Sequence, residues 1–264
     1  MKPSVKLLVA AMLSIIISGC GDAEQEQPPA ASGQPTLELP TEAISDDVAM
    51  LLWIDIERMT PNQVLESFEG MVDAVLDGAE QQEARKELRR KLAFYEKLHA
   101  DFTEVGGKGF LIGFTSGGNM FILIHVSEGT DRRAIRSALD HLPARLQSSV
   151  WVGPYAKCWL VVTDDQNRRM LRPVGGTKPN AKAFENLLDQ HRQAPVRAAV
   201  RMTHTLRGEL LKDTSIDLIR ECKQVSLGLQ LGRPSRVAMS AAMVDEQAAG
   251  HAVEEMRKQL VVSA

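Results

Sequence analysis

The sequence predicts an α+β fold whose sheet is largely antiparallel. Its predicted helices are separated by β-hairpins rather than by single strands, which favours this class over a doubly wound parallel fold. The order strand, helix, hairpin, helix occurs twice, over residues 48–142 and 195–260. We therefore expect two similar halves, each with its helices on one face of the sheet. Residue identity between the halves is slight, so the alternative to duplication is chance recurrence of common elements.

The first half begins with an apolar segment of strand length, Val48–Ile56. A helix is expected next, because Thr60-Pro61-Asn62-Gln63 supplies an N-cap, a proline at the first helical position and a capping-box glutamine. Apolar residues then recur at helical spacing as far as Leu98. We expect Gly78 to bend or split this helix.

A glycine-rich turn separates the next two apolar segments, Gly109–Phe114 and Met120–Val126. Two strands around such a turn predict a hairpin. The turn includes Gly113-Phe-Thr-Ser-Gly117, which has the outline of a nucleophile elbow with Thr115 in the nucleophile position. That motif requires a strained turn from a strand into a helix. Because strands flank it here, we interpret it as a hairpin turn.

Three further elements complete the first half and lead into the second. Thr130 is expected to cap a helix that stops before Pro143. A second hairpin is predicted from Ser149–Val152 and Cys158–Val162, and a helix is predicted to start at Asn180.

The second half contains the same kinds of element in the same order. They are a strand at Pro195–Met202, helical segments at Leu206–Leu211 and Ile216–Ile219, a hairpin formed by Val225–Leu231 and Val237–Met243, and a final helix capped by Asp245.

The N-terminus has the pattern of an export signal. Lys2 and Lys6 precede an apolar segment, Leu7–Ile17, which is too short to span a membrane. The sequence Ile17-Ser18-Gly19-Cys20 resembles the lipobox of bacterial lipoproteins. This resemblance implies that Cys20 becomes the first mature residue and carries a diacylglyceryl group, usually with an acylated amino terminus. The alternative is an ordinary signal peptide followed by a chance cysteine.

The lipobox divides the chain into a signal peptide at 1–19, a lipidated N-terminus and flexible tether at 20–44, and two halves at 45–164 and 165–264. The tether is polar and proline-rich, with a reach of roughly 25 Å for about 20 residues. Two or three acyl chains on Cys20 would anchor the protein firmly. Gly21 behind it, rather than aspartate, resembles signals for passage to an outer membrane. We therefore expect a lipid-anchored protein of the cell envelope, and the sequence favours the outer membrane over the inner membrane as its location.

The composition limits the classes of partner. The chain has 31 Lys and Arg against 34 Asp and Glu, and removal of Lys2 and Lys6 with the signal lowers the net charge to −5. This balance does not favour nucleic acid, and no basic stripe favours anionic lipid. Aromatic residues make up 5% of the chain, which gives little support to a sugar-stacking surface. The lipid anchor is thus the only membrane contact that we predict.

The sequence contains no pattern of a metal, cofactor or catalytic site. Its six histidines include no i, i+4 pair, and His125 in an apolar strand is interpreted as a packed, hydrogen-bonded residue. Asp55 and Glu57 could be paired carboxylates, but we interpret them as the point where a strand reaches solvent. Cys158 and Cys222 leave two alternatives open, a disulfide in an oxidising compartment or two buried, inert thiols.

The order of elements also resembles uncharacterised exported proteins of planctomycete-type bacteria. The residues that carry this resemblance are Val48–Ile56, Cys158–Asp164 and Asn180–Met202. It implies no activity, because those relatives are themselves unassigned. Our leading hypothesis is a non-catalytic lipoprotein domain that binds a ligand or an envelope protein partner, or that has a structural role, facing the periplasm or the cell exterior. The rivals are an envelope hydrolase whose site is assembled only in the fold, and a permanent subunit of an envelope complex.

Overall fold

The computed structural model describes residues 37–40, 44, 46–117, 119–139, 151–156, 158–163, 179–213 and 218–251. Cys20 and the expected signal and lipobox lie outside these residues. The strands are β1 (Val48–Asp55), β2 (Gly107–Thr115), β3 (Met120–Val126), β4 (Trp151–Ala156), β5 (Trp159–Thr163), β6 (Val196–Arg201), β7 (Cys222–Gln230) and β8 (Arg236–Met243).

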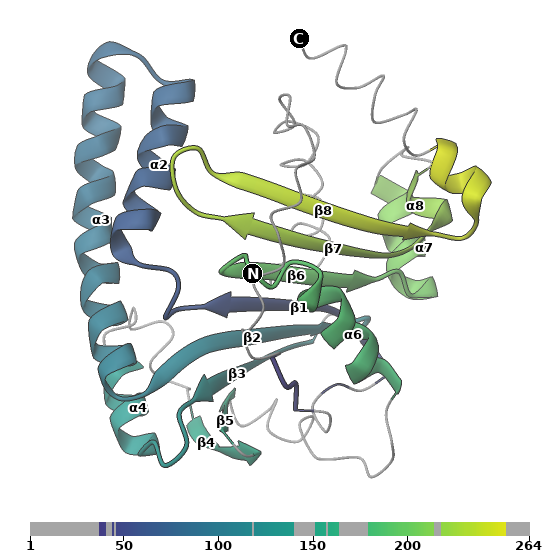
Figure 1. The fold of residues 1–264 in the computed structure, drawn as a ribbon, viewed down its shortest axis with the longest axis horizontal. Coiled ribbons are helices and arrows are strands. Elements are labelled where there is room, and N and C mark those ends of the chain that lie inside the picture. Colours follow the sequence, from purple (N-terminus) through teal and green to yellow (C-terminus); the bar gives the residue numbers. More distant parts are fainter. Residues whose placement is uncertain are drawn as a thin grey trace.

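These strands form one eight-stranded sheet in the order β4-β5-β3-β2-β1-β6-β7-β8 (Figure 1). Every neighbouring pair is antiparallel. The predicted α+β class with an antiparallel sheet is therefore confirmed. β1 pairs with β6, with β2, β3, β5 and β4 beyond β1 and with β7 and β8 beyond β6. The segments expected as two halves therefore share a single sheet.

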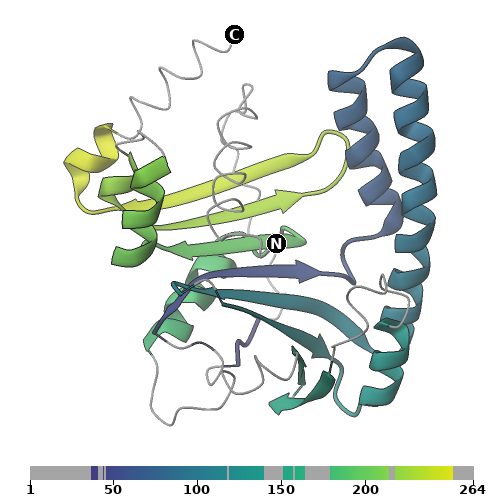
Figure 2. The same ribbon diagram turned by 180° about the vertical axis from the view of Figure 1, so that it is seen from behind.

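The helices are α2 (Pro61–Val75), α3 (Gly78–Glu104), α4 (Arg132–Leu139), α6 (Pro179–Asp189), α7 (His204–Asp213) and α8 (Leu218–Glu221). Helices α2 and α3 lie side by side at one end of the central strands, whereas α7 and α8 lie at the other end (Figures 1 and 2). In the described part of the chain, none of the helices is long and apolar enough to cross a membrane.

Local sequence signals explain several helix ends. The capping box at Thr60 is formed in both directions, with Gln63 on the N-cap amide and Thr60 accepting from the Gln63 amide. Gly78 has φ +58°, a left-handed conformation that favours glycine, and the chain divides there into α2 and α3 as expected. The Asp245 carboxylate accepts a hydrogen bond from the Ala248 amide at 2.8 Å, which confirms the predicted cap of the final helix.

The prediction that Thr130 caps α4 was wrong. The cap is Asp131, whose carboxylate accepts from the Arg133 amide at 2.9 Å. The Thr130 hydroxyl instead donates to the Ser127 carbonyl at 2.8 Å and closes the preceding turn. Pro143, the expected stop of this helix, lies outside the described residues.

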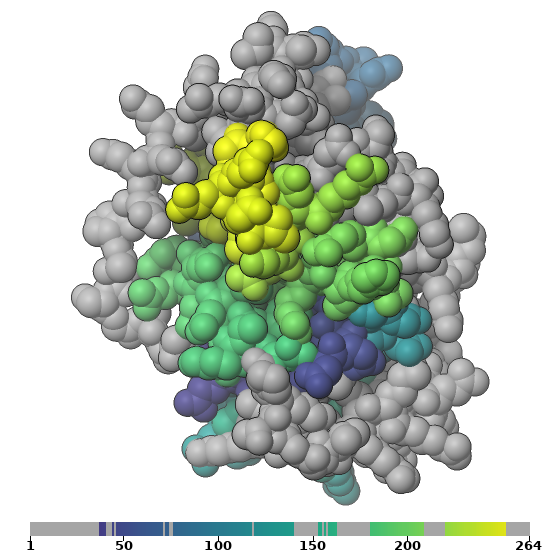
Figure 3. Space-filling view, turned by 90° about the vertical axis from the view of Figure 1, so that its right-hand side faces the viewer, coloured from purple at the N-terminus to yellow at the C-terminus, as the bar shows by residue number. Residues whose placement is uncertain are grey.

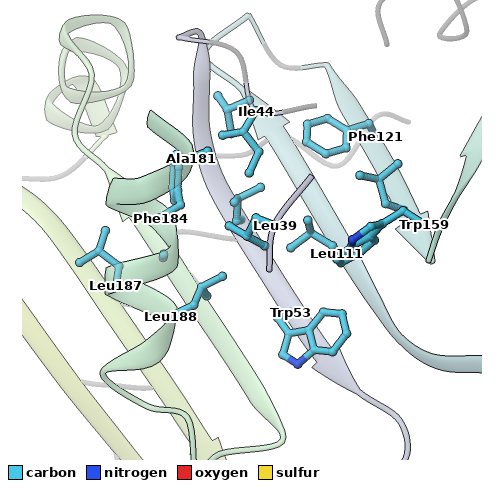
Figure 4. Packing of buried hydrophobic residues seen from close by; sticks show 14 of the residues in the cluster. Leu39, Ile44, Trp53, Leu111, Phe121, Trp159, Ala181, Phe184, Leu187 and Leu188 are labelled. Atoms are coloured by element: carbon cyan, nitrogen blue, oxygen red, sulfur yellow. The ribbon is translucent and has the colours of Figure 1, made fainter. Parts of the chain in front are cut away.

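Apolar side chains cover both faces of the sheet. Leu51 and Trp53 of β1 point to one face, here called the α6 face, where they belong to the same buried cluster as Phe184 of α6. Figure 4 shows Trp53 and Phe184 in this cluster. Met50 and Leu52 alternate with Leu51 and Trp53 and point to the opposite face, here called the α3 face. Other buried members of the α6-face core are Leu39, Ile44, Val48, Leu111, Phe121, Leu123, Trp159, Val161, Ala181, Leu187, Leu188 and Ala199.

We expected the helices of the second half to lie on one face of the sheet, but they lie on both faces. Helix α6 packs on the α6 face, whereas Leu206 of α7 packs with Met50 on the α3 face. Phe102 of α3 and Ile135 of α4 also pack against residues of the α3 face. The physical reason is that β1 is apolar at consecutive positions, so it has apolar side chains on both faces of the sheet. Helices must therefore shield both faces from water.

Candidate functional site

Three groups with shifted pKa values, Asp55, His125 and Arg197, lie on the α6 face near the end of β1. We define the Arg197 cluster as Trp53, Asp55, Arg58, His125, Trp159 and Arg197. The strand register explains its assembly. Trp53 pairs with Arg197, and Asp55 lies in a cross-strand row with Gly109, His125 and Trp159. Strands β1, β3, β5 and β6 thus contribute side chains to one patch, and β2 passes between β1 and β3 at Gly109.

The absence of a side chain at Gly109 allows the aromatic residues of this cluster to pack closely. A Cβ atom at this position would lie 2.6 Å from the Trp53 indole and 2.5 Å from the Ile54 carbonyl oxygen. The indole can therefore lie close to β2, with its ring centroid 6.0 Å from His125 and 6.1 Å from Trp159. The His125 and Trp159 centroids are 4.8 Å apart. The result is an aromatic group across the sheet in which both tryptophans are buried.

Arg197 is a buried cation in this environment. Its side chain is 6% exposed, and its Nε atom has no hydrogen-bond partner. The guanidinium carbon lies 6.0 Å from the centroid of the Trp53 ring, within the range of a cation–π interaction. Burial lowers the pKa of Arg197, and the charges of Asp55 and Asp189 oppose this shift. Asp189 ends α6, so the cation also lies near a helix C-terminus, which favours positive charge.

Asp55 and Arg58 connect the end of β1 to the segment before β6. Asp55 accepts a hydrogen bond from the Arg58 amide at 3.2 Å. The Arg58 guanidinium donates to the carbonyl oxygens of Arg192 and Gln193. Burial raises the pKa of Asp55, an effect opposed by the Arg58 hydrogen bond and by the charges of Arg58 and Arg197. These hydrogen bonds therefore connect the turn after β1 to residues 192–193 before β6.

A serine and a histidine also meet on the α6 face. His191 Nε2 lies 3.1 Å from the hydroxyl oxygen of Ser226, which donates to Gln190 Oε1 at 2.6 Å. Because a hydroxyl has one hydrogen, His191 donates its Nε2 proton to Ser226 in this arrangement. Ser226 is completely buried. Its oxygen is therefore neither activated by a base nor open to a substrate, although its distance from the histidine resembles that of a catalytic pair.

Cys158 and Cys222 are both free thiols. Cys158 immediately precedes β5 and Cys222 begins β7, and five strand-to-strand steps separate these strands in the sheet. At about 4.8 Å a step, this is roughly 24 Å, far beyond the Cα separation that a disulfide can bridge. Of the two alternatives, the disulfide is therefore excluded in this fold. Burial raises the pKa of Cys222, which makes its thiol less reactive.

The other residues singled out in the sequence have separate positions. Glu57 is exposed in the turn after β1, so it does not form a carboxylate pair with half-buried Asp55 on a strand face. Thr115 ends β2, and its hydroxyl accepts from the Asn119 amide at 3.2 Å within the hairpin turn. Among the residues that the structure describes, no three His, Cys, Asp or Glu side chains gather into a metal-binding group.

Sequence reasoning missed Arg197 and the pair of Ser226 and His191. Arg197 stands in the apolar strand β6, and a charge in such a run is a signal of an unusual environment. His191 follows a helix with no motif around it. Its position depends on Gly228, where a Cβ atom would lie 2.6 Å from the His191 Cβ.

Comparison with known proteins found no match: no family model, curated protein or solved structure is significantly similar to the chain. The function must therefore be argued from the residues and their geometry. In the Arg197 cluster, this geometry favours packing and hydrogen bonding within the chain.

His125 makes folding sensitive to acid. Burial, with a smaller contribution from the charge of Lys108, lowers its pKa to about 4. Between pH 7 and pH 4 the unfolded chain therefore binds a proton that the folded chain excludes, so stability falls as the pH falls. Because the ring is partly exposed, we expect His125 to account for a loss of about 2 kcal/mol. Urea denaturation at both pH values measures this loss.

The variant His125→Phe should retain the aromatic packing and show a smaller loss of stability on acidification. His251→Phe, at an exposed position, is the matched control and should behave like the unchanged protein. An equal loss in all three chains would contradict the assignment to His125.

Proposed function

We propose that the protein is an exported lipoprotein, anchored in the cell envelope through lipid on Cys20, with a non-catalytic binding or structural domain. The observation that carries the anchor is the short apolar segment ending in Ile17-Ser18-Gly19-Cys20. The polar segment behind it would act as the tether between the membrane and the sheet. This tether would end before Leu39, because Leu39 and Ile44, which the sequence placed in the tether, are buried in the α6-face core. Gly21 supports the outer membrane as its location, with the domain facing the periplasm or the cell exterior.

The non-catalytic part of this proposal is supported by how the polar atoms of the α6 face are used. Arg58 binds two carbonyl groups of its own chain, and Asp55 accepts from the amide of Arg58. Ser226 is buried and gives its hydrogen to Gln190. A hydrolase of the rival kind would need a nucleophile that a substrate can reach beside a base that can accept its proton. The Ser226–His191 pair lacks both properties.

We further infer that the body arose by duplication, with halves at 45–164 and 165–264. The sheet order supports this inference, because β1 and β6 pair antiparallel as neighbours inside the sheet. Each is followed along the chain by helices and then by a hairpin that adds to its outer side. A two-fold axis perpendicular to the sheet, between β1 and β6, would relate these two arrangements.

The anchor is tested by Cys20→Ser in the native envelope. The unchanged chain should fractionate wholly with membranes, band with the outer membrane on a density gradient and incorporate labelled fatty acid. We expect Cys20→Ser to lose the label, to be processed differently and to lose most of its membrane association, because no second membrane segment is predicted.

Cys158→Ser is the matched control, since it also removes a thiol but lies within the folded body. It should fractionate like the unchanged chain. If Cys20→Ser still partitions wholly with membranes and its processing is unaltered, the lipoprotein proposal fails.

A further inference from the structure

The two edges of the sheet differ in how they resist pairing with another strand. Edge strands expose unpaired backbone groups, which natural proteins guard with proline, bulges or charge. Edge strand β4 contains Pro154 and a register shift between Pro154 and Ala156. Edge strand β8 has eight residues, and after Arg236 it contains neither proline nor charge. Among the described residues, no strand pairs with its outer side (Figure 1).

The side chains of β8 are also open. Val237 is 47% exposed, and Ala238, Ser240 and Ala241 are exposed as well. Met239 and Met243 are half-buried on the α3 face. Figure 3 views the end of the molecule where β8 leads into the helix after Asp245, which is drawn in yellow. A long, uncharged edge of this kind favours the addition of a further strand.

The hydrogen-bond pattern identifies which groups of β8 point outward. The Asp55 amide donates to the Pro195 carbonyl, and the Met202 amide donates to the Lys223 carbonyl. Since hydrogen-bonding directions alternate along each strand, these two bonds set the pattern across β6 and β7. Ser240, opposite Ser226, then bonds to β7. The outward groups are consequently those of Val237, Met239, Ala241 and Met243.

We propose that β8 pairs antiparallel with β8 of a second copy of this chain, about a two-fold axis at Ser240. In this register Met239 bonds with Ala241 of the partner, and Val237 bonds with Met243. The Met239–Ala241 pairs place a long side chain beside a small one, while the α6 face of the contact carries only alanine and serine. The two sheets would join into one continuous sheet, and the interface would be isologous.

The charges at the ends of β8 support a second copy as the occupant. Arg236 is exposed at the start of the strand, and Asp245 and Glu246 are exposed just beyond its end. The two-fold register brings Arg236 of each copy beside Val244 of the other, next to these acidic residues. Neither Arg236 nor Glu246 has an ion-pair partner among the described residues. A strand from an unrelated protein would need an acidic group beside Arg236 and a basic group beside Asp245 and Glu246. A second copy of this chain supplies both.

Ser240→Cys tests this register directly. In the full chain, purified in mild detergent and oxidised, Ser240 of the two copies would form a non-hydrogen-bonded pair with Cα atoms about 4.5 Å apart, a distance that a disulfide can bridge. We expect a covalent dimer on a non-reducing gel. Ala238→Cys alone should not crosslink in this way, but a mixture of Ala238→Cys and Ala242→Cys chains should. The unchanged chain controls for the native cysteines.

Ala241→Pro supplies a second test, because it removes an outward amide and leaves the bonds to β7 intact. By symmetry two intermolecular hydrogen bonds are lost, so we expect dimerisation in sedimentation experiments to weaken by about tenfold or more. Ala241→Ser is the matched control and should dimerise like the unchanged chain. A monomeric unchanged chain, or crosslinking from Ala238→Cys as strong as from Ser240→Cys, would overturn the proposal. Protection of β8 only in the presence of another envelope protein would also overturn it, in favour of that partner.

Discussion

Replacing Phe184 with alanine is expected to lower the free energy of unfolding by about 4 kcal/mol. Phe184 of α6 is completely buried, and it joins the helix to the residues of β1 and β2 on the α6 face (Figure 4). Its removal would leave a cavity bounded by strands and a helix that the surrounding chain cannot readily close. Urea denaturation followed by circular dichroism measures the loss.

Phe94→Ala is the matched control for this prediction. Phe94 lies on α3 and is 43% exposed, so the same chemical change removes far less buried surface. We expect a loss below about 1 kcal/mol at this position. Similar losses at the two sites would contradict the packing of α6 on the sheet.

Gly113→Ala should destabilise the fold by about 3 kcal/mol, the upper part of the range for overpacking a core. A Cβ atom at this position would lie 1.9 Å from the buried ring of Phe121, its cross-strand partner on β3. The ring would have to move to remove this clash. Because Phe121 is part of the α6-face core, its movement would disturb the packing of that core. The measurement is again the free energy of unfolding in urea.

Two further variants distinguish this clash from a general intolerance of alanine. Phe121→Ala introduced together with Gly113→Ala should cost less than the sum of the two single changes, because the clash is absent in the double variant. Gly208→Ala lies on the exposed surface of α7, with no atom within 4 Å of the new Cβ. It should leave stability unchanged or raise it by up to about 1 kcal/mol. Additive losses in the double variant would contradict a contact between positions 113 and 121.

The Arg197 cluster explains how a charged residue is tolerated in a central strand. The cation lies against the Trp53 ring, with the carboxylates of Asp55 and Asp189 nearby. Arg58 meanwhile holds the segment before β6 through its carbonyl groups. Carboxylate, guanidinium and imidazole groups are common in catalytic sites. In this fold, those of the Arg197 cluster instead contact neighbouring strands and segments of the same chain.

Local chemistry made much of the fold predictable. The capping box at Thr60, the split at Gly78 and the cap at Asp245 each depend on residues a few positions apart. Strands and hairpins were also predictable, because apolar runs and glycine-containing turns are local signals. The cap of α4 was missed because Thr130 and Asp131 are adjacent and equally suitable, and the choice depends on the turn at Ser127.

The candidate site could not be predicted in the same way. Arg197 and Trp53 are adjacent only because β1 pairs with β6, and His125 joins them only through β2 and β3. The separation of Cys158 from Cys222 likewise follows from the strand order. Sequence spacing contains no information of this kind, since the partner of a strand depends on the packing of the whole sheet.

The amino-acid sequence was sufficient for the α+β class, the antiparallel strands and most helix boundaries, and it carries the expected lipobox at Cys20. The tertiary structure decided which faces the helices cover, which thiols remain free and which polar groups meet around Arg197. Secondary structure depends on capping, turn chemistry and periodicity over a few residues. Strand order and burial instead depend on contacts between residues more than a hundred positions apart, such as Trp53 and Arg197.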